Sequence, residues 1–116
     1  MSRVLTHIAY QVPDSLPGVE VVPMRNMIVI DGKRIKLTRV LVDVAFEIHK
    51  VAPHSLSLDQ LQARVRINGR APSRNVMYQH ICRLRKMLAG TRLSIVRVDA
   101  GYLLINAVTR TDIGAG

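Results

Sequence analysis

The chain is 116 residues long, which is enough for one domain with a single hydrophobic core and too short for two. Its composition, 48% hydrophobic and 22% charged, is that of a globular protein and excludes a disordered tail. Lys and Arg number 17 against 8 Asp and Glu, and the net charge of +9 favours an anionic partner over the alternative of simple solubility. Nucleic acid is the first candidate.

The sequence also argues against a membrane span, a disulfide bond and a metal site. No apolar run is long enough to cross a membrane, and the N-terminus lacks the uninterrupted apolar stretch of a signal peptide, so we expect a cytoplasmic protein. The single cysteine, Cys82, excludes an intramolecular disulfide. The four histidines lack zinc-ligand spacing, so we expect no metal and no cofactor. His49 ends a predicted helix, where a cation suits the helix dipole.

The N-terminal third predicts a small antiparallel sheet. Residues 1–18 are an extension in which 4–12 have the composition of a strand, before two prolines and a glycine interrupt it. Residues 19–22 are predicted to form a second short strand. "MIVIDGKRIKL" then places two strand-like runs around Asp31-Gly32, a dipeptide typical of a type I′ hairpin turn.

Three helices follow, and each has a recognisable start. Thr38 and Ser73 are predicted caps of the first and third, and Ser57 with Gln60 forms a capping box for the second. The first helix ends near 51, ahead of a proline, and the third ends at about Leu88, ahead of Gly90. The residues expected to face the core at helical spacing are Leu41, Val44, Ala45 and Ile48 in the first helix, Leu58, Leu61 and Val65 in the second, and Met77, Ile81, Leu84 and Leu88 in the third.

Residues 93–105 contain two β-rich runs joined by a short turn at 99–101, which predicts a C-terminal hairpin. The order of sheet, three helices and hairpin is that of an α+β winged helix-turn-helix, with the hairpin as the wing. We expect this domain to span 19–108, followed by a flexible tail at 109–116.

The third helix, residues 73–88, combines a buried stripe with a cluster of basic and hydrogen-bonding side chains. A recognition helix needs both features, because its inner face is held rigidly while its outer face reads a groove. A solvated surface helix is the alternative interpretation. Clustered arginines in the preceding loop and in the wing favour DNA, and these are Arg66, Arg70, Arg92 and Arg97.

The segments "NVMYQHICRLRKML" and "IVRVDAGYLL" resemble the third helix and wing of the OmpR/PhoB-type winged-helix domain, the effector half of many bacterial response regulators. The family pattern is V-x-V-H-I-x-R-L-R-K-x-L, followed by a Gly-Tyr pair in the wing. The resemblance covers roughly residues 20–106 and includes "IKLT" before the first helix. It implies binding to double-stranded DNA, with the third helix in the major groove and the wing on the backbone or minor groove.

The resemblance also implies residue roles. It gives Asn75 a phosphate contact, His80 a groove-facing position, Arg83 a base contact, and Arg85 a backbone or base contact. Tyr102 matches a wing tyrosine that touches the phosphate backbone. The complete predicted DNA-binding set is Arg74, Asn75, Tyr78, Gln79, His80, Arg83, Arg85, Lys86, Arg97 and Tyr102.

Two positions depart from the family pattern. Leu41 replaces the acid of the first-helix motif Leu-Thr-x-x-Glu. The family's Val-Arg-Gly wing tip is Val98-Asp99 here, and the arginine comes one place earlier, at Arg97. Since successive strand residues point to opposite faces, this shift changes where the arginine points.

These observations predict a nucleoid-associated, stand-alone transcriptional regulator, because no segment before residue 20 is long enough for a receiver domain. Possible partners besides DNA are RNA polymerase and a second copy of the chain. The alternatives are a protein-interaction module that docks on RNA polymerase or another regulator, and a non-specific DNA-packaging protein. No catalytic motif is present, so we expect no enzyme. The target sequence and the sign of regulation stay open.

Overall fold

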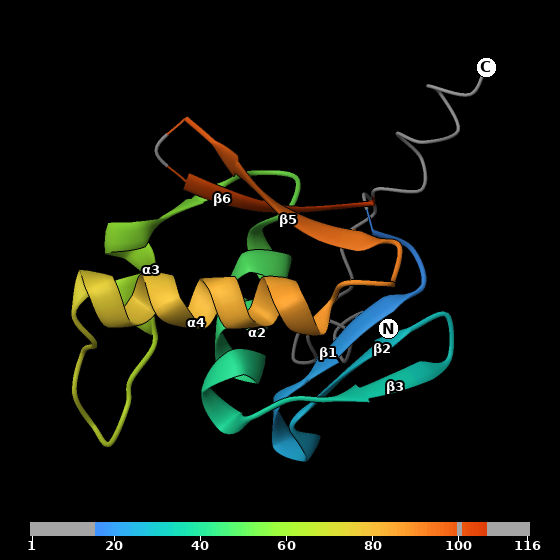
Figure 1. Cartoon of the computed structure of the whole chain (residues 1–116), viewed down its shortest axis with the longest axis horizontal. Helices are drawn as coiled ribbons and strands as arrows, with labels where there is room; N and C mark the ends of the chain where they lie inside the picture. The colour runs from blue at the N-terminus through green and yellow to red at the C-terminus, as the bar shows by residue number, and fades with distance from the viewer. Residues whose placement is uncertain (1–15, 100, 107–116) are drawn as a thin grey trace, which may run out of the picture.

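The computed structural model describes residues 16–99 and 101–106 (Figure 1). The predicted strand at 4–12 and the tail at 109–116 lie outside the described residues. In chain order the elements are β1 (Val19–Val22), the 3₁₀ helix η1 (Pro23–Arg25), β2 (Met27–Ile30), β3 (Lys33–Lys36), α2 (Arg39–Val51), β4 (Leu56–Ser57), α3 (Leu58–Arg64), α4 (Arg74–Met87), β5 (Leu93–Val98) and β6 (Gly101–Asn106).

Strands β1, β2 and β3 form the predicted antiparallel sheet, in that order. Asp31 and Gly32 both have positive φ, +52° and +85°, as a type I′ turn requires, so the predicted hairpin is confirmed. Successive side chains along each strand point to opposite faces of the sheet, and one of these faces is turned towards the core. Val19, Val21 and Ile28 on this face are buried in the common core.

The three helices begin at the predicted caps. The hydroxyl of Thr38 accepts a hydrogen bond from the backbone N–H of Leu41, and Ser57 and Gln60 form the reciprocal capping box. Ser73 caps α4 in the same way. Since each side chain satisfies a backbone donor that a helix start leaves free, these caps locate the helices from local sequence. All predicted inward residues of the helices are buried except Leu58, which is half-buried.

The C-terminal sheet has the order β4-β6-β5, so the predicted hairpin of β5 and β6 gains a third strand. Sequence reasoning missed β4, because a two-residue strand has no periodicity to detect. Leu56 pairs with Tyr102 and Ser57 with Gly101. A Cβ atom on Gly101 would lie 3.0 Å from the carbonyl oxygen of Leu56, so the close approach of these strands requires glycine there. The confirmed architecture is an α+β winged helix.

His49 corrects an expectation about charge. It lies at the end of α2, as predicted, but its side chain is fully buried. Burial lowers the pKa of His49 to about 4, so the imidazole is neutral at neutral pH. The free-energy cost of desolvating a buried cation exceeds the stabilisation that the helix dipole would provide. The interpretation of His49 as a cation was therefore wrong.

Candidate nucleic-acid interface

Helix α4 turns one face to the core and the other to solvent. Met77, Ile81 and Leu84 are all 0% exposed and anchor the helix against α2 and α3. Four polar or basic residues at intervals of four, four and three lie on the opposite side, where they form one continuous strip. We call this the exposed strip, and it consists of Asn75, Gln79, Arg83 and Lys86, all exposed.

The side of α4 next to the wing is partly occupied by contacts within the protein. The Nε of Arg85 donates a hydrogen bond of 3.1 Å to the carbonyl oxygen of Ile95, which joins α4 to β5. A hydrogen bond with the thiol of Cys82, which also lies in α4, raises the pKa of Tyr78. Arg85 is therefore half-buried and helps to hold the wing, whereas Tyr78 is 45% exposed.

The structure places Tyr102 differently from its expected role. Its side chain is only 3% exposed, so little of it is open to a phosphate. Arg97 lies directly opposite Tyr102, and Ile95 lies opposite Leu104, so these four side chains share one face of the hairpin. The inner part of this face is core. Arg97 lies on its outer part, near the tip, and is exposed there.

Neighbouring groups affect two other predicted contact residues, one through ion pairing and one through its protonation. Arg74, at the start of α4, makes an ion pair with Asp59 of α3. His80 is half-buried, and burial together with the nearby Arg83 lowers its pKa, which favours the neutral imidazole. Among the described residues, the basic side chains of α4 that are not paired with a carboxylate are Arg83, Arg85 and Lys86.

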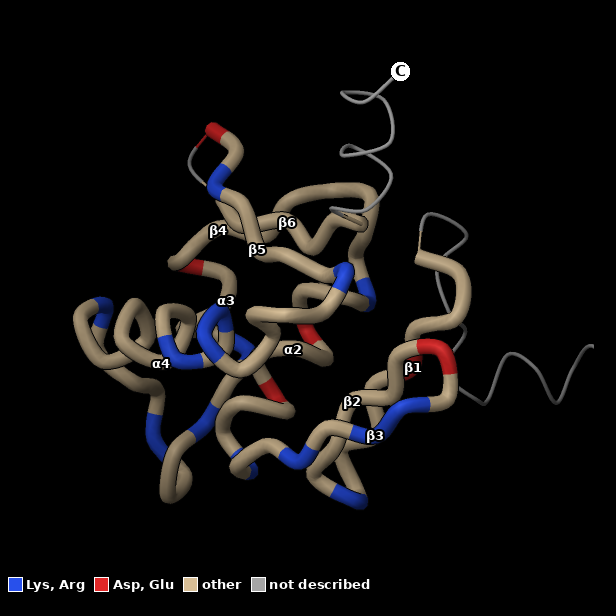
Figure 2. Tube along the Cα trace, turned by 45° about the vertical axis from the view of Figure 1, so that its right-hand side comes forward, with Lys and Arg blue, Asp and Glu red and all other residues tan. Residues whose placement is uncertain are grey.

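Basic residues also lie away from α4. Figure 2 shows Lys and Arg in the loop between α3 and α4, and along β3 to the start of α2. Sequence reasoning did not single out this second group, although three of the four β3 residues are cations. A charged edge strand is also a common protection against unwanted strand pairing, so charge alone does not assign it a ligand. The group consists of Lys33, Arg34, Lys36 and Arg39.

The four arginines expected to flank α4 separate into two pairs. One Nη of Arg66 donates hydrogen bonds to backbone carbonyl oxygens at the end of α3, including that of Ala63 at 2.9 Å. Arg92 is also engaged within the protein. Arg70 and Arg97 are exposed, and we assign the external charge of the loop and the wing to them.

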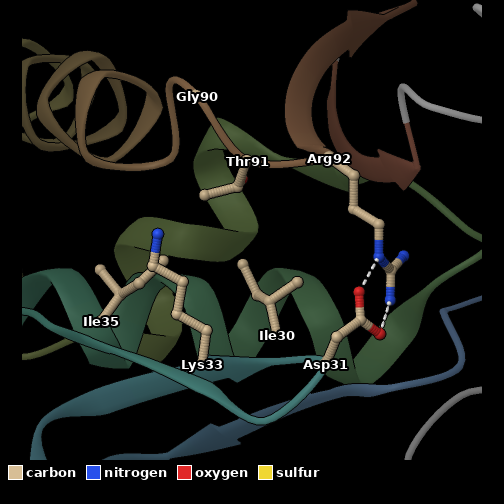
Figure 3. A pocket seen from close by; sticks show the side chains of 7 residues that line it. All are labelled: Ile30, Asp31, Lys33, Ile35, Gly90, Thr91 and Arg92. Atoms are coloured by element: carbon tan, nitrogen blue, oxygen red, sulfur yellow. Dashed lines mark hydrogen bonds and ion pairs between the residues drawn. The ribbon is translucent and has the colours of Figure 1, made fainter.

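Arg92 ties the end of α4 to the N-terminal sheet. Its Nε and Nη2 donate to the two carboxylate oxygens of Asp31 at 2.7 and 2.9 Å (Figure 3). The Nη2 atom also donates to the carbonyl oxygen of Pro17 at 2.7 Å. This hydrogen bonding lowers the pKa of Asp31. Gly18 has a φ of +80°, and a Cβ there would lie 2.5 Å from the Asp31 carboxylate, so the tie requires glycine. The hollow beside it, of about 320 Å³, is also lined by Ile30, Lys33, Ile35, Gly90 and Thr91.

Neither a metal site nor a membrane span is found in the described part of the chain. Residues 16–99 and 101–106 contain no group of three or more His, Cys, Asp or Glu side chains that are placed to hold a metal ion. Among the same residues, no helix has the length and apolar character needed to cross a membrane.

Comparisons with known proteins agree with this architecture. No protein-family model matches the chain, and no curated protein does. The DNA-binding domain of Escherichia coli CadC is similar in structure, with a TM-score of 0.62, 27% sequence identity, and coverage of 84% of this chain and 94% of that one.

Two further solved structures show the same fold at lower identity. The DNA-binding domain of the response regulator AdeR, solved in complex with an intercistronic region, has a TM-score of 0.63 and 17% identity, covering 77% of this chain and 95% of that one. A member of a family of streptococcal redox sensors that evolved from two-component response regulators has a TM-score of 0.62 and 20% identity, covering 89% of this chain and 46% of that one. The chain therefore has the fold of an OmpR/PhoB-type winged-helix DNA-binding domain.

Proposed function

We propose that the protein binds double-stranded DNA at specific sequences and regulates transcription. Helix α4 lies in the major groove, and the wing contacts the backbone or the minor groove. The observation that carries this proposal is the exposed strip, a row of hydrogen-bonding and basic side chains on a helix whose other face is completely buried. A helix held so firmly positions its outer side chains against base edges at little entropic cost.

The exposed strip combines residues that contact phosphates with residues that contact base edges. Asn75 lies in the first turn, where free backbone N–H groups also favour a phosphate. Gln79 and Arg83 occupy the middle of the strip, and they have the donors and acceptors to pair with adenine and guanine, each through two hydrogen bonds. Lys86, near the end of the helix, supplies a flexible charge for a phosphate.

The remaining predicted residues have supporting roles. Arg97 reaches the backbone from the wing, and the terminal nitrogens of Arg85 do so from beside it. Arg74 and Tyr78 contact the strand that passes the start of α4, and His80 offers a neutral hydrogen-bonding ring at the edge of the groove. Tyr102 acts from the core by supporting the wing, since its side chain is buried and lies opposite Arg97.

The test is selection of bound duplexes from a random pool, followed by gel-shift competition between the selected site and random DNA. We expect a preferred site, and the band pattern gives the number of copies bound. If four to six phosphates are neutralised, log affinity falls against log salt with a slope of about −4 to −5. Equal affinity for selected and random duplexes would favour DNA packaging, and no binding at low salt would overturn the proposal.

A second candidate function is docking on an acidic protein surface, such as one on RNA polymerase or another regulator. Met24 in η1 favours it, because this side chain is 97% exposed beside a hollow of about 310 Å³. Arg39 and Asp43 line this hollow and also a neighbouring one of about 450 Å³. A protein that binds no duplex at low salt, yet loses partner binding on Met24→Ala, would support docking instead.

A further inference from the structure

Val76 is an apolar side chain on the polar side of α4. It is 37% exposed and lies outside the buried stripe of Met77, Ile81 and Leu84. Core packing therefore explains a valine at this position only in part. Helix formation does not explain it, because β-branched residues are poorer helix formers than alanine or lysine. Solubility would also be better served by a polar residue.

The position of Val76 is that of a residue that faces a groove. It lies in the first turn of α4, where its backbone N–H donates to the capping hydroxyl of Ser73 at 3.2 Å. Gln79 follows three residues later and Arg83 seven residues later, so all three lie on the same side of the helix. Recognition helices contact base edges mainly through their N-terminal residues. With α4 in the major groove, Val76 is thus closer to the base edges than the residues of the last turn are.

The major groove offers apolar side chains one distinctive partner. Thymine carries a C5-methyl group there, whereas the edges of the other bases present hydrogen-bonding groups. We infer that Val76 reads a thymine methyl group, next to the base pairs contacted by Gln79 and Arg83. This inference rests on the proposed function and adds a base preference to it. Burying one methyl group against an apolar side chain strengthens binding by about fourfold.

The experiment removes the methyl group and the side chain separately. Each thymine of the selected site is replaced in turn by deoxyuridine, which lacks only the C5-methyl group. Affinities are measured for the unmodified protein, for Val76→Ala and for Met87→Ala. Met87 is the matched control, because it is also apolar and 43% exposed but lies in the last turn of α4. Alanine is the best helix former, so both variants keep the helix.

One thymine should stand out. At that position, deoxyuridine weakens binding by about fourfold for the unmodified protein and for Met87→Ala. The loss is clearly smaller for Val76→Ala, because alanine keeps only the β-carbon of the side chain. The inference is overturned if no single thymine matters, or if Val76→Ala keeps the full sensitivity. Either result leaves sequence-specific binding intact. A protein that selects no preferred site would instead overturn the proposed function, and this inference with it.

Discussion

Helix α4 has 14 residues, and its two faces have opposite environments, one buried in the core and one exposed to solvent. The inner face, with Met77, Ile81 and Leu84, is wholly buried and determines where the helix sits. No side-chain hydrogen bond or ion pair joins the exposed strip to the rest of the described residues, so its residue types are free to serve a ligand. The difference teaches that folding and binding are separable on this helix, and that substitutions on the two faces should have separate consequences.

The side of α4 next to the wing is intermediate between these faces. Arg85 is half-buried and donates a hydrogen bond to the carbonyl oxygen of Ile95, and Tyr78 is hydrogen-bonded to Cys82. Substitutions there should alter both the position of the wing and the charge presented to DNA. The clean comparison therefore uses the inner face and the exposed strip.

The largest effect is expected on the inner face. Leu84→Ala should lower the free energy of unfolding by about 2–5 kcal/mol, because it leaves a cavity in a fully buried site. Urea denaturation measures this change, and Lys86→Ala on the exposed strip is the control, expected to stay within about 0.5 kcal/mol. A loss below about 1 kcal/mol for Leu84→Ala would mean that the helix is rotated and the two faces are wrongly assigned.

The contrast between buried and exposed positions extends to histidines. His49 has a pKa of about 4 in the folded protein and 6.5 as its ordinary value, so the unfolded chain binds the extra proton. Its contribution to stability is complete above pH 6.5 and is lost as the pH falls from 6.5 towards 4, by about 3 kcal/mol.

Urea denaturation at a series of pH values measures this loss. His49→Gln should flatten the dependence over that range, while His54→Gln, at an exposed position, should retain it. An unchanged slope in His49→Gln would assign the acid sensitivity to other groups.

Arg83→Ala tests whether the exposed strip reads sequence. We expect a loss of about 1–3 kcal/mol at the selected site and relaxed choice at one base position, with unchanged thermal stability. Arg39→Ala, on α2, also removes an exposed charge, from outside the strip, and should leave the base preference intact. If Arg83→Ala weakens selected and random duplexes by the same factor, Arg83 is a phosphate clamp instead of a reader.

Lys86→Ala should weaken all duplexes about equally, because a phosphate contact carries no sequence information. The slope of log affinity against log salt should become shallower by about one unit. The measurement is a salt titration with the selected site and with one random duplex. A change in base preference would place Lys86 among the reading residues.

The smallest effect concerns Asp59, the exposed carboxylate that pairs with Arg74. Asp59→Asn frees this arginine for phosphate and removes a negative charge near the start of α4. Affinity at low salt should rise by about twofold, and the gain should disappear at high salt. The control is Asp59→Asn in an Arg74→Ala background, where the gain should shrink. The same twofold gain in that background would show that the pair has no influence on binding.

Local sequence determined most of the fold. Thr38, Ser57 with Gln60, and Ser73 set the three helix starts, and Asp31-Gly32 set the first hairpin. Each of these signals acts over about four residues, because a cap or a tight turn satisfies backbone groups next to it. The inward stripe of α4 could be read from the 3.6-residue period for the same reason. Once the buried stripe was located, the same period showed which residues lie on the opposite face, and these are the residues of the exposed strip.

Only the tertiary structure decided which of the remaining polar groups are available to a ligand. Arg92 is taken up by Asp31, 61 residues away in the chain, and Tyr102 is buried beneath the tip of the wing. His49 lost its charge to burial among side chains of other elements, and β4 exists only because β6 lies beside it. Such contacts depend on loop closure and on the packing of distant segments, and neither leaves a periodic or local pattern in the sequence.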